Sequence, residues 1–173
     1  MVTVVALGLT LAFEPTEPGA MARKPRSPSE SLLSGVLLWR IAFVSLLFVI
    51  GAFGIFYYAL DRGLSVDLAR TMVVNTIVVM ELFYLFSVRY AHGTALTWRG
   101  MLGTPAVFVG IAAVVVAQLA FTYLPVLQKV FATEAIEPAD GLLIVLIGVL
   151  LLLLVEAEKS VSGLLEKRRV PST

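Results

Sequence analysis

The sequence predicts an all-α membrane protein with four complete transmembrane helices and a truncated half-helix at the N-terminus. Two observations support this prediction. Of the 173 residues, 59% are hydrophobic and only 14% are charged, which is typical of membrane proteins and unlike an ordinary soluble domain. The hydrophobic residues also form five long stretches, and lipid accepts such stretches only as helices or closed barrels, because it offers the backbone no hydrogen bonds.

The first hydrophobic stretch, Met1–Phe13, is too short to cross a bilayer. Its 13 residues would extend about 20 Å as a helix, whereas a span needs roughly 20 residues. A signal peptide is a poor alternative, because no basic region precedes the stretch. We therefore expect residues 1–13 to be the C-terminal half of a transmembrane helix, so that the chain begins in mid-helix.

A proline-rich basic segment, residues 14–34, follows. Its four prolines favour an extended chain over a helix, because proline has a fixed φ and no N–H. Arg23, Lys24 and Arg26 give the segment a positive charge that could attract anionic lipid or an acidic protein surface. The alternative is that these basic residues are only the ordinary positive charge that flanks membrane helices on the cytoplasmic side. The small number of basic residues by itself favours this alternative.

Four complete spans are expected next, within a four-helix transmembrane domain at residues 35–159. They run approximately Gly35–Leu60, Thr71–Val88, Pro105–Leu127 and Gly141–Val155. The last span is short, but Glu156 and Lys159 can extend it into the interface at i,i+3 spacing. Residues 160–173 are expected to form a basic cytoplasmic tail.

Small residues occur at four-residue spacing in the third complete span. Ala106 with Gly110, and Ala113 with Ala117, could let two helices approach closely. The alternative is that they reflect only the high frequency of small residues in membrane helices.

The basic residues predict the orientation of the spans. Ten of the 13 lysines and arginines flank the proline-rich segment, the loop that contains His92, and the C-terminus. Cytoplasmic loops carry the excess of basic residues in membrane proteins. We therefore expect a multi-pass membrane protein with a cytoplasmic C-terminus. The excess of arginine over lysine suggests a bacterial plasma membrane.

Glu81 stands out because it is a carboxylate in the middle of a hydrophobic span. It lies about ten residues, or roughly 15 Å of helix, from either end of that span. Because such a charge is costly in lipid, we expect Glu81 to be an ion ligand or a proton acceptor that faces other helices. The structural alternative is a protonated carboxyl group that is hydrogen-bonded to a neighbour such as Tyr84 at i+3.

Two further polar residues lie within hydrophobic stretches. Asn75 is about 120° from Glu81 around the helix, so the two share no face, and Asn75 is expected to hydrogen-bond to another helix. Thr3 could offer its hydroxyl oxygen, or a backbone carbonyl oxygen without a partner in the helix, as a ligand. Threonine side chains in helices, however, commonly hydrogen-bond to the backbone of their own helix.

The composition excludes several kinds of site. Without cysteine the chain has no disulfide and no thiolate ligand, and with His92 as its only histidine we expect no dedicated structural metal site. The nearly balanced charge gives no indication of nucleic acid binding. Since no Asp-Lys-Thr-Gly motif, phosphate-binding glycine-rich loop or Ser/His/Asp set occurs, no catalytic residues are predicted in this chain.

Several short motifs carry a family resemblance. They are Met-Val-Thr at the start, Phe13-Glu14-Pro15, Met21, Pro25-Arg26, Pro28 and Leu33-Ser34-Gly35, followed by Thr71-Met72 ten positions before Glu81. In these motifs the sequence resembles the C-terminal membrane region of type II P-type cation ATPases, and their spacing fits the calcium pumps. The resemblance covers essentially the whole chain, although the last two helices match mostly by hydropathy.

The resemblance implies that residues 1–13 end the sixth pump helix and that the four complete spans are the seventh to tenth. It carries Thr3 and Glu81 over as ion ligands, and it places the basic segment against the phosphorylation domain. The implied partners are the transported cation, the remaining helices and cytoplasmic domains of the pump, and the lipid bilayer. A complete pump would use ATP and Mg, with no cofactor within this chain.

One position departs from the calcium pumps. The Asp that follows the counterpart of Thr3 and bridges both ions is replaced here by Val4. Losing a carboxylate removes an oxygen ligand and a negative charge, which disfavours the usual two-calcium site and suits a monovalent ion, a proton or one divalent ion. The family also has an Asn before Met-Val-Thr, so Met1 is expected to be an internal methionine of a longer pump.

We therefore predict that the chain is the C-terminal transmembrane domain of a cation-transporting P-type ATPase, present as a fragment without the ATP-hydrolysing domains. The alternative is an independent small membrane protein that binds or regulates a partner without catalysis. It would require residues 1–13 to lie at the membrane interface, where a helix without basic residues is disfavoured. A third possibility is a degenerate pump remnant with no function.

Overall fold

The computed structural model describes residues 2–12, 35–88 and 105–169 of the chain. These residues form helices and, within the described ranges, no strand. The helices are α1 (Val2–Leu11), α2 (Gly35–Asp61), α3 (Val66–Val88), α5 (Pro105–Tyr123), α6 (Pro125–Phe131) and α7 (Pro138–Arg169).

The predicted all-α membrane architecture is confirmed. Three helices, α2, α3 and α7, are each long and apolar enough to cross a membrane, and α5 with α6 provides a fourth span if the bent pair is counted as one. Helix α1 has only 10 residues, which agrees with the short N-terminal helix expected from the sequence. The chain is therefore an integral, multi-pass membrane protein.

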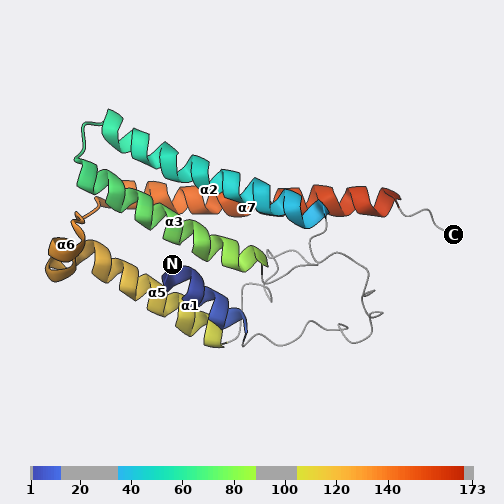
Figure 1. Cartoon of the computed structure of the whole chain (residues 1–173), viewed down its shortest axis with the longest axis horizontal. Helices are drawn as coiled ribbons and strands as arrows, with labels where there is room; N and C mark the ends of the chain where they lie inside the picture. The colour runs from blue at the N-terminus through green and yellow to red at the C-terminus, as the bar shows by residue number, and fades with distance from the viewer. Residues whose placement is uncertain (1, 13–34, 89–104, 170–173) are drawn as a thin grey trace.

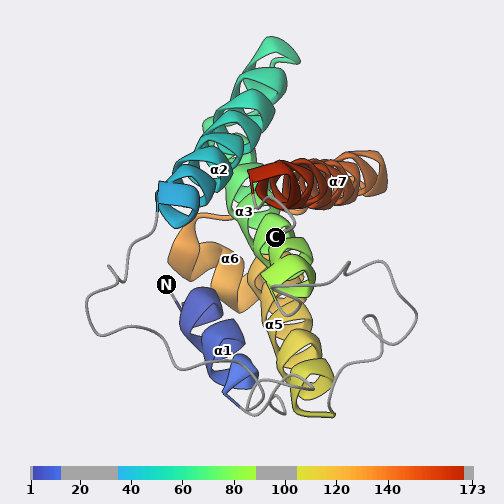
Figure 2. The same cartoon turned by 90° about the vertical axis from the view of Figure 1, so that its right-hand side faces the viewer.

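Helix α3 is the central element of the bundle. It packs against α2 and α7 on one side and against α1 and α5 on the other (Figures 1 and 2). It begins just after Ser65, whose Oγ accepts a hydrogen bond from the backbone N–H of Leu68 at 3.0 Å, as an N-cap residue does. The helix thus starts at Val66, earlier than the expected span Thr71–Val88, because the cap and not the hydrophobic pattern sets its first turn.

Three clusters of buried hydrophobic side chains hold the helices together. Two lie between α2, α3 and α7; one contains Ile55, Ala59, Ala69, Met72, Ile136 and Ile144, and the other contains Val44, Met80, Leu151 and Val155. The third joins α1, α3 and α5 and contains Leu7, Val78, Leu85, Val107 and Val114. Helix α3 contributes to all three clusters, so its position is fixed from both sides.

Two glycines let α3 approach its neighbours closely. A Cβ atom at Gly51 of α2 would lie 2.8 Å from Met80 Sδ, and one at Gly148 of α7 would lie 2.5 Å from Phe83 Cδ2. In contrast, Ala113 and Ala117 of α5 are exposed, so this small-residue pair makes no close helix contact among the described residues. Gly51 and Gly148 are thus small residues that mediate packing without having been indicated by the four-residue spacing, whereas the other predicted pair includes Ala106, whose side chain lies outside the described residues.

The third complete span ends earlier than expected. Helix α5 stops at Tyr123, and α6 continues from Pro125 after a bend of 76°. Proline has no N–H to continue the helix and disfavours the helical conformation in the residue before it, and Leu124 is accordingly extended at φ −82° and ψ 119°. The predicted boundary at Leu127 was therefore wrong, because hydrophobicity continues past the residue that breaks the helix.

The last helix is longer than its hydrophobic stretch. Helix α7 runs from Pro138 to Arg169, and thus includes Glu156 and Lys159 as the sequence predicted. It also continues through most of residues 160–173, the segment predicted to be a tail. The division of the chain into the four predicted domains stays a prediction.

Candidate functional site

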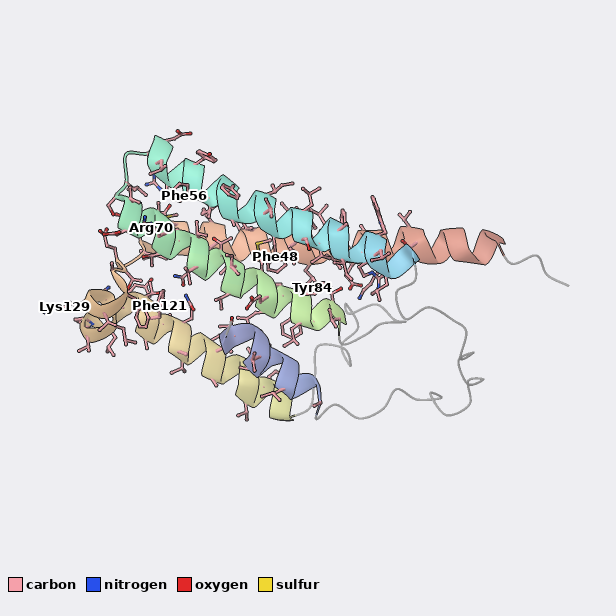
Figure 3. All side chains as sticks on the ribbon, viewed as in Figure 1. Phe48, Phe56, Arg70, Tyr84, Phe121 and Lys129 are labelled. Atoms are coloured by element: carbon pink, nitrogen blue, oxygen red, sulfur yellow. The ribbon has the colours of Figure 1, made fainter. Side chains whose placement is uncertain are left out.

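Glu81 lies half-buried on α3 with one oxygen atom that the fold does not satisfy. Its Oε2 atom is buried and, among the described residues, has no hydrogen-bond partner. No hydrogen bond joins Glu81 to Tyr84 within the described part of the chain. The Tyr84 ring meets Phe48 of α2 edge-on instead, with the ring centroids 6.4 Å apart (Figure 3).

The neighbours of Glu81 place it beside α1 and α5. Val78 precedes Glu81 by three residues and Leu85 follows it by four, so both lie near it on the helix surface. Both belong to the buried cluster that also contains Leu7 of α1 and Val114 of α5. Glu81 therefore lies at the edge of the face of α3 that packs against α1 and α5.

Thr3 lies on the neighbouring helix. It is half-buried on α1 and precedes Leu7 by four residues, so it shares the face of α1 that packs against α3. The structure thus puts Thr3 and Glu81 on two packed helices. No hydrogen bond connects these two described side chains.

Gln118 of α5 is a polar residue of the membrane interior that our reading of the sequence did not consider. Its Nε2 atom is buried and lacks a hydrogen-bond partner among the described residues. Glu81 Oε2 and Gln118 Nε2 are the two atoms with this property within the described ranges. The search of the sequence for charged residues missed Gln118, whereas a search for any polar side chain within a hydrophobic span would have found it.

Asn75 makes the interhelical hydrogen bond that the sequence predicted. Its Nδ2 donates to Thr122 Oγ1 of α5 at 3.0 Å and to the backbone carbonyl of Thr71 at 2.9 Å. Gln128 Nε2 of α6 donates to the backbone carbonyl of Thr122 at 2.7 Å. These polar groups have partners, so they serve to join α3, α5 and α6.

Glu134 and Thr133 complete the same end of the bundle. The backbone N–H of Glu134 donates to Thr71 Oγ1 at 3.1 Å, and Thr133 Oγ1 donates to the backbone carbonyl of Phe121 at 2.9 Å. The segment after α6 is thereby fixed to the helices that it covers.

A second polar cluster joins α3 and α7 at the opposite end. Ser87 Oγ donates to Glu156 Oε1 at 2.7 Å, and Lys159 Nζ contacts the same oxygen at 2.9 Å. Lys159 Nζ also donates to the backbone carbonyl of Ser87, one of the last carbonyls of α3, which have no partner within the helix. The Glu156 and Lys159 side chains are only 6% and 13% exposed, so the ion pair is largely buried.

Two further ion pairs connect α7 with α2 and with the residue that follows α2. Arg40 Nε lies 3.3 Å from Glu158 Oε2 at one end of the helices. At the other end Arg62 lies 2.5 Å from Asp140 Oδ1. A hydrogen bond to Tyr58 and the charge of Asp140 raise the pKa of Arg62, so that this side chain remains charged.

The described residues contain no group of three or more His, Asp and Glu side chains that could hold a metal ion. Glu81 is thus a single carboxylate that belongs to no such group. Arg23, Lys24 and Arg26, the predicted contact to cytoplasmic domains, lie outside the described residues. So do His92 and its loop, and the Val4 side chain.

These features define a polytopic helical membrane protein with a buried, unsatisfied carboxylate on its central span, the class to which ion transporters belong. Residues 1–161 match the family described as the C-terminus of cation transporting ATPases. The chain therefore belongs to this family, as the C-terminal membrane region of a P-type ATPase, and the resemblance noted in the sequence is confirmed.

The relatives are much longer than the chain. The probable cation-transporting ATPase F of Mycobacterium tuberculosis is 46% identical over 138 residues, which cover 79% of this chain and 15% of the relative. A cation-transporting ATPase of Synechocystis is 32% identical over 142 residues, covering 79% and 16%. The calcium-transporting ATPase of Bacillus subtilis is 30% identical over 142 residues, covering 79% and 15%. The chain thus spans about one sixth of these relatives or less.

Proposed function

We propose that the chain works as the C-terminal ion-translocation and support region of a pump that moves cations across a membrane, with Glu81 as an ion ligand. The observation that carries this proposal is the buried Glu81 Oε2 atom without a hydrogen-bond partner. An unsatisfied carboxylate oxygen inside a membrane protein is strongly unfavourable unless a ligand or a proton compensates it. A cation passing through the pump supplies that compensation.

Thr3 is the second ligand in this proposal. Thr3 is a half-buried residue of α1 and lies four residues before Leu7, which packs in one cluster with α3, the helix of Glu81. The relatives named as calcium-transporting ATPases support a type II, calcium-pump-like arrangement. Val4 offers no side-chain oxygen, so a site with fewer charges than a two-calcium site is proposed: one divalent ion, a monovalent ion or a proton.

The rigid contacts of α3 suit a supporting role. Gly51 and Gly148 bring α2 and α7 against α3, and the pair Glu156 and Lys159 fixes the end of α3 to α7. We infer that α2, α3 and α7 hold Glu81 in place while other helices of the pump rearrange. That rearrangement would be driven by phosphorylation of an aspartate in domains that use ATP and Mg.

The orientation and location that we propose for the helices follow from the assignment of the chain to a cation pump. The start of α2 and the ends of α3 and α7 lie at the same end of the bundle (Figure 1), and the predicted basic regions flank this end. We propose that this end faces the cytoplasm of a bacterial cell, where the basic residues Arg23, Lys24 and Arg26 contact cytoplasmic domains of the pump. Lipid surrounds the helices, and no role in nucleic acid binding is proposed.

The test is a chimera in which this chain replaces the matching C-terminal region of the mycobacterial relative. Glu81→Gln keeps the size of the side chain and removes its charge. We expect the cation concentration for half-maximal ATPase activity to rise at least about tenfold. The control is Glu134→Gln, which changes an exposed carboxylate outside the spans. An unchanged cation dependence in the Glu81→Gln chimera would remove Glu81 from the site.

A further inference from the structure

We propose that Gln118 of α5 is a ligand of the same cation as Glu81, so that α5 contributes directly to the ion site. The side-chain amide would supply a neutral oxygen next to the carboxylate of α3. This inference rests on the proposed function, because it needs a cation at Glu81. It adds a helix and a residue that neither the sequence motifs nor the resemblance indicated.

The hydrogen bond between Asn75 and Thr122 fixes the register of α3 and α5. The two helices run in opposite directions (Figure 1), and one buried cluster contains Val78 and Leu85 of α3 together with Val107 and Val114 of α5. Residues nearer the C-terminus of α3 therefore lie beside residues nearer the N-terminus of α5.

This register brings Glu81 and Gln118 to nearly the same level. Glu81 lies six residues after Asn75, which is about 9 Å along α3. Gln118 lies four residues before Thr122, which is about 6 Å in the same direction along the bundle. Counted from this hydrogen-bonded pair, the backbone positions of the two residues thus differ by roughly 3 Å in level, and the long Glu and Gln side chains can span such a difference to reach one ion.

Both residues also border the same packed face. Gln118 is four residues from Val114 and from Thr122, and these two buried residues face α3. Glu81 lies between Val78 and Leu85 at the edge of the face of α3 that packs against α1 and α5. The two residues therefore come from adjacent helices toward one interface.

Two buried polar atoms of α3 and α5 need a binding partner that the described fold does not supply. Nearly all buried polar atoms in native proteins have partners, and an exception points to an ion, a water or a strained site. The two exceptions in the described part of the chain are Glu81 Oε2 and Gln118 Nε2, and they belong to α3 and α5, two helices that contact each other. A single ligand between α3 and α5 satisfies both residues.

The amide can present the atom that a cation needs. Rotation by 180° about the last side-chain torsion exchanges Nε2 and Oε1 of Gln118 in nearly the same volume. The oxygen then takes the buried position and can coordinate a cation with the Glu81 carboxylate. One negative charge and one neutral oxygen suit a metal cation that has shed part of its water.

The variant Gln118→Leu separates a ligand from an ordinary buried residue. Removing an unsatisfied amide from an apolar environment should leave the unfolding temperature of the chain in lipid nanodiscs unchanged or higher. In the chimera, the same variant should raise the cation concentration for half-maximal ATPase activity about tenfold or more. A loss of cation affinity would therefore occur without a loss of stability.

Gln128→Leu is the matched control. Gln128 is the same residue type on the adjacent α6, but its amide donates to the Thr122 carbonyl at 2.7 Å. Its replacement should lower the unfolding temperature and leave the cation dependence within twofold of the parent. Gln118→Glu keeps an oxygen ligand and adds a charge, so it should preserve or increase the affinity for Ca²⁺ relative to Gln118→Leu.

The outcomes are distinguishable. A tenfold loss for Gln118→Leu, with recovery in Gln118→Glu, supports the proposed ligand. If Glu81→Gln weakens cation dependence and Gln118→Leu leaves it within twofold, Gln118 is not a ligand and the proposed function stands. If neither variant has an effect, both proposals fail.

Discussion

At the scale of single residues, the partners of a polar group separate structural roles from functional ones in this membrane domain. Asn75 and Gln128 have hydrogen-bond partners on other segments, and so they stabilise the packing of helices. Glu81 and Gln118 each carry a buried polar atom that the described fold leaves without a partner. Because lipid offers no compensation, residues of the second kind are the candidates for binding.

The ion pair of Glu156 and Lys159 leads to a prediction at this scale. Lys159→Met should lower the free energy of unfolding by about 1–3 kcal/mol, because it removes an ammonium group from the buried Glu156 carboxylate and the donor from the Ser87 carbonyl. Denaturant titration of the chain in detergent micelles would measure this loss. The control Lys129→Met alters an exposed lysine on α6 and should change the free energy by less than about 0.5 kcal/mol.

The double variant Glu156→Met with Lys159→Met sharpens this test. Replacing both charges by apolar side chains also removes the cost of burying the Glu156 carboxylate, so the loss should be smaller than in Lys159→Met alone. Equal losses in the single and double variants would mean that the ion pair does not stabilise the contact of α3 with α7.

At the scale of the helices, close packing depends on two glycines that lie against α3. A Cβ atom at Gly148 would come within 2.7 Å of Val79 Cγ1 and still closer to the Phe83 ring. Since both are parts of side chains in a packed interface, α7 would have to move away from α3 or these side chains would have to leave their preferred rotamers.

Gly148→Ala is therefore expected to lower the free energy of unfolding by about 1–3 kcal/mol. Gly54→Ala is the matched control, because no atom lies within 4 Å of the Cβ that it would add on α2. There alanine should raise the free energy by about 0.5–1 kcal/mol through its better helix propensity. Similar effects of the two variants in unfolding experiments would contradict the close contact of α3 with α7.

At the scale of the whole molecule, the sequence predicts the architecture better than its details. Hydrophobic stretches identify α2, α3, α5 and α7, because each must be long and apolar to cross a bilayer. They do not identify where α5 ends, since Val126 and Leu127 remain hydrophobic after Pro125 has broken the helix. Helix boundaries depend on caps and prolines, which hydropathy does not register.

The candidate site could be predicted only in part for a related reason. Glu81 is visible in the sequence because a charge in a span is rare, and Asn75 was correctly expected to bond between helices. Gln118 is neutral, and only the packing of α5 against α3 reveals that its amide is buried without a partner. Likewise, no local spacing distinguishes Gly148, which contacts α3, from Gly54, which contacts nothing within 4 Å.

The bend after α5 limits the length of this helix. The stability of the protein should therefore depend on the thickness of the surrounding bilayer. Helix α5 has 19 residues, which is about 28 Å of helix, whereas α7 has 32 residues and about 48 Å. A typical hydrocarbon core is about 30 Å thick, so α5 just fits it and α7 has length to spare. Thick bilayers should strain α5 first.

We therefore expect the unfolding temperature, measured in nanodiscs of increasing acyl-chain length, to peak where the hydrocarbon core is close to 28 Å. Pro125→Ala removes the barrier to a longer helix and should move this peak toward thicker membranes. A peak at the same thickness in both proteins would show that α5 does not set the match. Since α5 carries Gln118, the lipids that surround the protein would then also affect the affinity of the proposed cation site.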